Sequence, residues 1–457
     1  MLKTYTKTTL PKKIKVGLFI AVIIFCIFGY VSEWKSIRSM VQGVDFCNYY
    51  IAAFSVKQLN LKDIYKPENA LIAATVLQKK AYLSGQRLLF ETVSCWIFGL
   101  QQKPTTYHFI GSPFLFTVLS IFKFDNYLMS LWTYRLFSLT CYVLSIWWLS
   151  RHLGYSIFST GIFILILTSW FGPFRFGMLV LNVDPLQLAA LTLFLYLLNL
   201  SGWATIFLSG ILLGLTFAFK PNIMFAILAL GIFWIVNRHF KKLILTAFGV
   251  AAGIMTAVLI SSAFFGTIRC WIDWYTRLNK FADDILCFPD NYAIAKILYK
   301  FCGTYTSAYI AAILLLPAIY VIWISRTPRL PLGDNKKYVK NTAPNFQKNV
   351  LVISTGLMIY LLSGSVVWEH YLIYTIPIML IACIPPINKQ WFNNYELITK
   401  QVLVVIAFLF LSIRNFALIS DNVAGLIINA GALILFTLGL WDLWRIGKGR
   451  CDNTTVP

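Results

Sequence analysis

The stretch that decides the fold is the apolar run VGLFIAVIIFCIFGY at residues 16–30, followed after a short polar segment by GVDFCNYYIAA at residues 43–53. The run carries no charge and no small-residue cleavage signal, which is typical of a retained signal anchor. The first fifteen residues contain five lysines and no acid, so we expect the N-terminus in the cytoplasm. The second segment then puts a carboxylate, Asp45, beside the outer face of the membrane.

The composition excludes most soluble classes of protein. The chain has 457 residues, of which 59% are hydrophobic and 12% are charged, whereas soluble domains carry roughly 25% charged residues. The formal charge of +22 is scattered in short basic clusters between apolar runs, which is the distribution that fixes topology in membranes rather than one that binds nucleic acid.

The apolar runs predict an all-α polytopic membrane protein, with a single integral membrane domain over residues 1–457 and about twelve transmembrane helices. After the anchor, we expect spans near residues 127–149, 155–171, 186–200, 203–219, 223–236, 243–265, 305–324, 350–362, 371–384, 402–413 and 423–444. Two shorter runs, 88–100 and 109–122, either both cross the membrane or both stay out. We expect them to form interfacial helices, because short amphipathic segments favour the membrane surface.

Basic clusters set the expected topology. They lie at Arg151 and His152 and in the segments 238–242, 326–348 and 445–450. The positive-inside rule assigns all of them to the cytoplasm, and counting crossings from a cytoplasmic N-terminus satisfies each one.

This count predicts a multi-pass protein of the plasma (inner) membrane with both termini in the cytoplasm. Residues 32–107 become a first outer loop with interfacial helices, 267–304 a second outer loop, and 326–349 a cytoplasmic basic loop.

Polar residues gather at the outer ends of the expected helices, where they deserve a functional hypothesis. If residues 43–53 are helical, Asp45, Asn48 and Tyr49 share one face. Each candidate also has a structural reading. Asp45 could cap a helix, Asp184 before Pro185 fits an ordinary N-cap, Lys220 could reach the headgroups, and His370 could belong to an interfacial aromatic belt.

Three stretches resemble the family 87 glycosyltransferases, which are polyprenyl-phosphate-mannose-dependent mannosyltransferases of the GT-C type. The opening motif is represented by Asp45-Phe46, Tyr49-Tyr50, Ala52-Ala53 and then Asp63-Ile64-Tyr65. A helix with Gly210 and Gly214 that ends in Lys220-Pro221, and the turn Trp368-Glu369-His370-Tyr371, are similar to two later motifs.

The chain also departs from the family pattern. The proline of the late turn is replaced by Gly364 or Ser365, and a Gly-Gln-x-Asn motif is only echoed by Gly177, Asn182 and Gln187.

The resemblance implies a GT-C-like bundle and an inverting hexosyltransferase. The enzyme would move a sugar, expected to be mannose, from a polyprenyl-monophosphate donor to a lipid or glycan acceptor on the outer face of the membrane. Asp45 matches the catalytic aspartate of the family and would be the base, and His370 matches its late-turn histidine. Lys220 and Arg175 would face the phosphate. The remaining expected substrate-binding residues are Asn48, Tyr49, Asp184, Trp368, Glu369 and Tyr371.

The scheme requires no cofactor or metal. The nine cysteines are dispersed without a CxxC pair, although a disulfide among Cys270, Cys287 and Cys302 stays open. A divalent cation held between Asp45 and either Asp184 or Glu369 is an alternative.

A transporter or flippase of a lipid-linked or anionic substrate is a second class of function, which predicts ionisable residues near the midplane and broken helices. A purely structural membrane subunit is a third.

Overall fold

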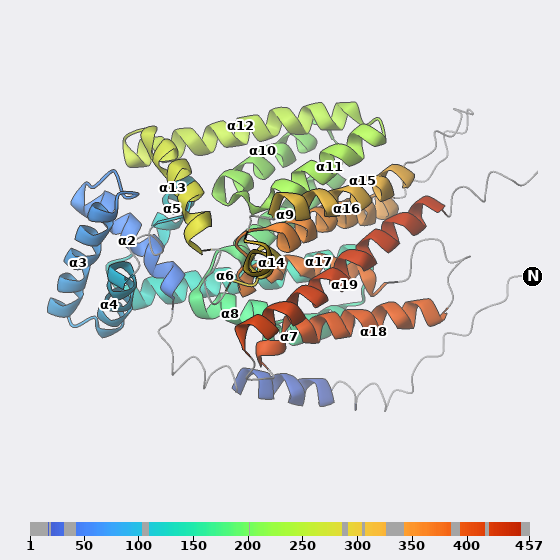
Figure 1. Ribbon diagram of the computed structural model, residues 1–457, viewed down its shortest axis with the longest axis horizontal. Helices are drawn as coiled ribbons and strands as arrows, with labels where there is room; N and C mark the ends of the chain where they lie inside the picture. The colour runs from blue at the N-terminus through green and yellow to red at the C-terminus, as the bar shows by residue number, and fades with distance from the viewer. Residues whose placement is uncertain are drawn as a thin grey trace, which may run out of the picture.

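The computed structural model describes residues 17, 20–31, 43–102, 109–200, 202–285, 291–303, 307–325, 342–384, 394–415 and 420–448. In these residues every regular element is a helix (Figure 1), so the expected all-α class is confirmed.

From residue 43 onward, the described chain is a succession of α-helices and short 3₁₀ helices. They are α2 (Val44–Leu59), α3 (Pro67–Leu83), α4 (Arg87–Gln102), α5 (Pro113–Leu119), η1 (Ser120–Phe122), α6 (Tyr127–His152), α7 (Ile157–Ser169), α8 (Gly172–Val180), α9 (Asp184–Asn199), α10 (Trp203–Phe219), η2 (Pro221–Ile223), α11 (Met224–Val236), α12 (Phe240–Phe265), α13 (Arg269–Ile285), α14 (Ile294–Cys302), α15 (Ser307–Ile324), α16 (Thr342–Ser363), η3 (Glu369–Thr375), α17 (Ile376–Ala382), α18 (Asn394–Leu411), η5 (Ile413–Asn415) and α19 (Asp421–Lys448).

Several of these helices are long and apolar enough to cross a membrane. Among the described residues, four qualify by length and composition: Phe240–Phe265, Ser307–Ile324, Phe346–Ser363 and Asn422–Arg445. The number rises to six if two bent pairs each count as one span. The expected count of about twelve is therefore not confirmed. Runs such as Trp203–Phe219 and Glu369–Ala382 are apolar but form shorter helices.

The expected loops contain more helix than a loop implies. Residues 43–102, within the first expected outer loop, form α2, α3 and α4, and the loop expected at 267–304 contains α13 and α14. Helix α16 begins at Thr342, within the segment 326–349 that is expected as a cytoplasmic loop. The apolar run expected near 350–362 is therefore shorter than the helix that contains it, because polar residues before the run are also helical. Residues 326–341 lie outside the described part of the chain.

Small residues bring α10 and α12 unusually close together. A Cβ atom added to Gly210 would lie 2.5 Å from the carbonyl oxygen of Thr246, and one added to Gly214 would lie 2.3 Å from that of Val250. The facing positions on α12, Gly249 and Gly253, are equally tight. Residue numbers rise together along the two helices, so they run parallel and end at the same side of the bundle.

This side of the bundle also contains the polar residues that we expect from the sequence at the functional site. Figure 1 shows α2, α3, α4, α5 and α13 together at one end, beside the C-terminal ends of α10 and α12. The functional candidates are therefore found where helices end and are joined by short connections.

Candidate functional site

A cavity of about 760 Å³ lies at this end of the bundle. Its lining includes Asn182 and seven expected site residues, namely Asp45, Asn48, Tyr49, Lys220, Trp368, His370 and Tyr371. These residues come from α2, from the connection before α9, from the end of α10 and from the segment around η3. Side chains that are up to about three hundred residues apart in sequence thus share one wall.

Asp45 lies in the first turn of α2 and faces inward. The helix starts at Gly43, whose φ of 72° favours glycine and whose N–H donates to the carbonyl of Leu179 at 2.9 Å. The Asp45 carboxylate makes no cap bond. Instead its Oδ2 accepts from the Asn182 side-chain amide at 2.6 Å. The helix-cap reading of Asp45 is therefore wrong.

Lys220 stands where α10 ends. A residue before proline is pushed into extended backbone, and Lys220 has φ −156° and ψ 114° ahead of Pro221. Its Nζ donates to Asp184 Oδ1 at 2.5 Å and to Asn182 Oδ1 at 3.3 Å. The same Nζ lies 3.9 Å from the centroid of the Tyr371 ring, so the ammonium group has a carboxylate, an amide and an aromatic face around it.

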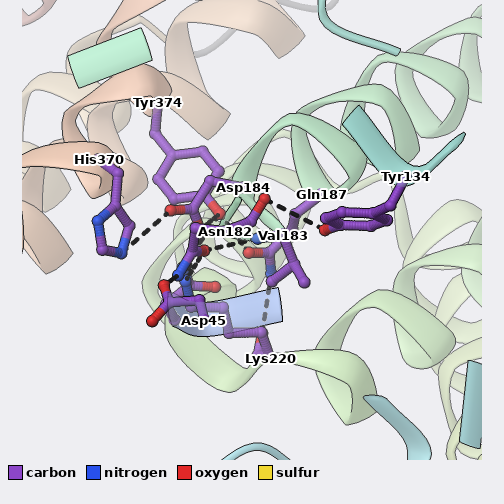
Figure 2. A network of polar contacts seen from close by, with 10 residues as sticks. Asp45, Tyr134, Asn182, Val183, Asp184, Gln187, Lys220, His370 and Tyr374 are labelled. Carbon is purple, nitrogen blue, oxygen red and sulfur yellow. Dashed lines mark hydrogen bonds and ion pairs between the residues drawn. The ribbon is translucent and has the colours of Figure 1, made fainter. Parts of the chain in front are cut away.

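Asp184 is 1% exposed and holds the centre of this network (Figure 2). Besides Lys220, it accepts from the Tyr374 hydroxyl at 2.7 Å, and its Oδ2 lies 3.7 Å from His370 Nε2. The N-cap of α9 is Val183 and no side-chain cap bond is made, so the N-cap reading of Asp184 is wrong. Its carboxylate instead pairs with groups on other segments.

Asn182 connects the two acidic residues. Its amide nitrogen donates to Asp45, and its Oδ1 accepts from Lys220 and from the Val183 N–H at 2.7 Å. The preceding residue, Leu181, has φ 57° and ψ 54°, a left-handed conformation that is unfavourable for a residue with a side chain. Backbone strain of this kind clusters at functional sites, and here it ends α8 and turns Asn182 into the cavity.

Aromatic side chains complete the cavity. Asn48 accepts a hydrogen bond from the Trp96 indole, and both line the wall beside Tyr49. The His370 ring stacks on Phe176 with centroids 5.9 Å apart. Flat apolar faces next to polar groups are suited to binding a sugar ring.

Three expected residues are not at the wall. Arg175, Asp184 and Glu369 are not among the described residues that line the cavity. Asp184 is buried and binds Lys220, which lines the cavity. Glu369 is also buried. Lys220 is consequently the one lysine or arginine among the described lining residues.

Two network residues were not expected as site residues. Asn182 belongs only to the echo of a motif, and Tyr374 belongs to none of the motifs. The Tyr374 hydroxyl lies within hydrogen-bonding distance of Asp184 and Gln187, and it accepts from Asn222 at 3.2 Å. It lies three residues after Tyr371 in the 3₁₀ helix η3, where side chains three apart eclipse one another. Because this 3₁₀ geometry is not apparent from an apolar sequence, no sequence signal marks Tyr374 as a site residue.

Burial raises the pKa of Asp45 at the cavity wall. Asp45 lies outside the candidate spans, and desolvation raises its pKa to about 6, against the opposing effects of the Asn182 hydrogen bond and the Lys220 charge. A carboxylate with this pKa is still ionised near neutrality and is a stronger base than an exposed aspartate.

The donor set does not resemble a metal site. Among the residues that the structure describes, no group of three or more His, Cys, Asp or Glu side chains is placed to hold a metal ion. Asn182 and Lys220 bridge Asp45 to Asp184, so a cation and an amide already stand where a shared divalent ion would bind. Cys270 is free, and Cys287 lies outside the described residues.

Comparison with known proteins identifies a family. The sequence model of glycosyltransferase family 87 matches residues 109–338, which is half of the chain. The matched region contains Asn182, Asp184 and Lys220, whereas Asp45 and His370 lie outside it. No curated protein and no solved structure matches the chain.

Proposed function

The chain belongs to glycosyltransferase family 87, and from this premise we propose that it is an inverting enzyme using a polyprenyl-monophosphate sugar. The sugar, which we expect to be mannose, passes to a lipid or glycan acceptor on the outer face of the membrane. The observation that carries the proposal is that a carboxylate, Asp45, and a cation, Lys220, line the same cavity. A transporter or flippase is not favoured, because the family is one of glycosyltransferases.

The reaction assigns Asp45 the role of base. As the acceptor oxygen bonds to C1 of the sugar, its proton passes to the Asp45 carboxylate. A buried carboxylate with a pKa of about 6 suits this transfer, since a general base works best when its pKa lies near the working pH. The Asn182 amide holds Oδ2 at 2.6 Å, which leaves Oδ1 for the acceptor.

The leaving group is stabilised by Lys220. The bond between C1 and the phosphate oxygen breaks, and its electron pair stays on that oxygen, so negative charge develops on the polyprenyl phosphate. A fixed cation in a water-poor cavity stabilises such charge strongly. Asp184, at 2.5 Å, pairs with the ammonium group and holds it in place. His370, whose Nε2 lies 3.7 Å from the same carboxylate, orients the phosphate or the acceptor from beside Lys220. The remaining roles that we propose for substrate binding fall to Asn48, Tyr49, Trp368 and Tyr371.

The test compares Asp45→Asn with the wild type. Membranes that contain each protein are incubated with radiolabelled polyprenyl-phosphate mannose, and transfer to lipid or glycan is measured. Loss of a general base costs about 10²- to 10⁴-fold, so Asp45→Asn should lower the rate by at least about a hundredfold. Transfer by Asp45→Asn near the wild-type rate would exclude Asp45 as the base.

Two controls separate catalysis from folding. Glu91→Gln removes a carboxylate at the same end of the bundle that is exposed and paired with Arg87, and it should keep wild-type transfer because surface ion pairs contribute little. Ionising Asp45 in its buried site costs free energy, since its pKa is raised when the chain folds. Asp45→Asn should therefore unfold at the same or a higher temperature than the wild type at pH 8. A lower unfolding temperature would indicate a structural role.

A further inference from the structure

The helix α13 exposes an apolar stripe that no described part of the chain covers. Ile268, immediately before the helix, is 63% exposed, Ile272 is 64% exposed and Tyr275 is 62% exposed. Their spacings of four and three residues put them on one face of a helix. Large apolar side chains in a row on one face mark a surface that meets something other than water.

The other faces of α13 fix how the helix is rotated. The Trp271 indole donates to Ser261 Oγ at 2.8 Å, and the Trp274 indole donates to the carbonyl of Ile110 at 2.9 Å. Cys270 is buried. These contacts hold α13 against α12 and the segment before α5, so the stripe cannot turn inward without breaking them.

The same helix forms part of the cavity. Trp274 and Leu278 both line it, and on a helical wheel they lie between the buried side at Cys270 and the exposed stripe. Arg269 and Asp273 lie on the opposite side of the stripe, with Arg269 Nε 3.6 Å from an Asp273 carboxylate oxygen. Around the helix, the order is cavity, apolar stripe, then charged groups.

The position of α13 in the chain identifies what covers the stripe. The preceding helix α12 is a candidate membrane span, and its exposed residues include Phe248, Met255 and Leu259. It ends at Phe265, the chain turns at Gly266, which has φ 70°, and the stripe begins at Ile268. A spanning helix ends at the membrane surface, so the stripe continues the lipid-facing surface of α12 at the depth of the headgroups.

We propose that α13 lies on the membrane surface, with Ile268, Ile272 and Tyr275 inserted into the bilayer and with Trp274 and Leu278 held at the adjoining wall of the cavity. Amphipathic helices bury an apolar face at the boundary between headgroups and acyl chains in this way, and tyrosine favours the same depth. The charged side with Arg269 and Asp273 then meets water.

This placement has a consequence that rests on the proposed function. A donor with a polyprenyl tail stays in the bilayer while its phosphate and sugar react in the cavity. Because the lipid-facing and cavity-facing sides of α13 adjoin, the reacting group passes along α13 without leaving the membrane surface. The membrane contact itself does not depend on the reaction.

The experiment measures how deep the stripe lies. Ile272→Cys is spin-labelled in the full chain and reconstituted, at one copy per disc, in nanodiscs of phosphatidylcholine and phosphatidylglycerol. Power saturation then compares collisions with oxygen, which concentrates in lipid, and with a water-soluble nickel chelate. Label on the native cysteines is measured in the unsubstituted chain and subtracted. The matched control is Thr276→Cys, which is turned toward the charged side of the same helix and is also exposed.

We expect the ratio of oxygen to nickel accessibility to be several-fold higher at position 272 than at position 276. Equal ratios would overturn the proposal, because the stripe would then face water. Protection of position 272 from both reagents would also overturn it, since a single copy in a disc leaves only the chain itself as a cover. As a second measurement, Ile268→Asp should raise the nickel accessibility of the label at position 272, and no change would count against insertion. A chain with no transferase activity in any assay would refute the proposed function and leave these ratios unchanged.

Discussion

At the scale of single residues, the site works as a chain of charge and amide groups rather than as a lone acid. Asp45 bonds to Asn182, Asn182 bonds to Lys220, and Lys220 bonds to Asp184. A buried charge is tolerated only when it is paired and hydrogen-bonded. These hydrogen bonds satisfy that condition for Lys220. The ammonium group has three N–H donors and uses two of them on Asp184 and Asn182, so the third can meet an anion in the cavity.

The pH dependence of the reaction follows from Asp45. The base acts in its ionised form, so kcat/KM should fall with decreasing pH through about 6, the value to which burial raises its pKa. The donor is a phosphodiester and does not titrate in this range. The measurement is the initial rate at subsaturating donor between pH 5 and pH 8. A rate that stays level down to pH 5 would contradict the assignment.

Asn182 should determine the pH at which kcat/KM falls on the acid side of the profile, which we call the acid limb. Its hydrogen bond lowers the pKa of Asp45 against the effect of burial, so Asn182→Ala should move the acid limb to higher pH and lower the maximal rate. The pH profile is the decisive measurement, because a merely structural loss would lower the rate without moving the limb. Asn182→Gln, which keeps the amide, should show a smaller shift.

The sequence could predict the side chains that carry charge but not those that join them. Asp45, Lys220 and His370 were expected on one side of the membrane from helix counting and from the resemblance, and they share one cavity. Tyr374 could not be expected in the same way, because a buried tyrosine in an apolar run resembles core packing. Its role depends on Asp184, which lies 190 residues away in the chain.

At the scale of helices, the glycines of α10 hold the cation in place. Gly210 and Gly214 lie against the backbone of α12, in the small-residue packing that brings membrane helices together. Lys220 follows on the same helix. The sequence motif that resembles the family pattern is therefore explained by close backbone contact.

Gly214→Ala should separate the two helices. Its Cβ would lie 2.3 Å from the Val250 carbonyl oxygen, so backbone must shift, at a cost of about 1–3 kcal/mol. We expect a lower unfolding temperature in detergent and slower transfer, because Lys220 moves with α10. The matched control is Gly161→Ala in α7, where nothing lies within 4 Å of the added Cβ and where alanine favours the helix. A Gly214→Ala protein as stable as the control would contradict the packing argument.

Hydropathy predicted the number of spans less well than their location. Each segment expected after the anchor overlaps a described helix, yet only four to six spans pass the test of length and composition in the described residues. The segment 371–384 begins inside the 3₁₀ helix η3, where His370 and Tyr371 face the cavity. Apolar composition cannot reveal this, because the 3₁₀ geometry is set by packing against α8 and α16.

At the scale of the whole molecule, the cavity and the basic clusters that set the expected topology lie at opposite ends of the bundle. The cavity lies where α9, α11 and α15 begin and where α10 and α16 end. Two of these clusters lie at the opposite ends of their helices, with Arg151 at the end of α6 and Arg445 near the end of α19. The positive-inside rule therefore favours a cavity that faces outward.

Two native cysteines test this orientation without any substitution. Cys95 on α4 is exposed, and it shares a helical face with Arg87 and Glu91 at the cavity end. Cys383 is partly exposed and lies at the other end, close to Tyr155, whose hydroxyl donates to the Leu380 carbonyl at 2.6 Å. A membrane-impermeant maleimide added to intact cells should modify Cys95 and spare Cys383, and permeabilised cells should show modification of both, as read from the masses of the two peptides. Modification of Cys383 alone in intact cells would place the cavity on the cytoplasmic side. The donor would then have to be reached from the inner leaflet, which would contradict the proposed reaction on the outer face.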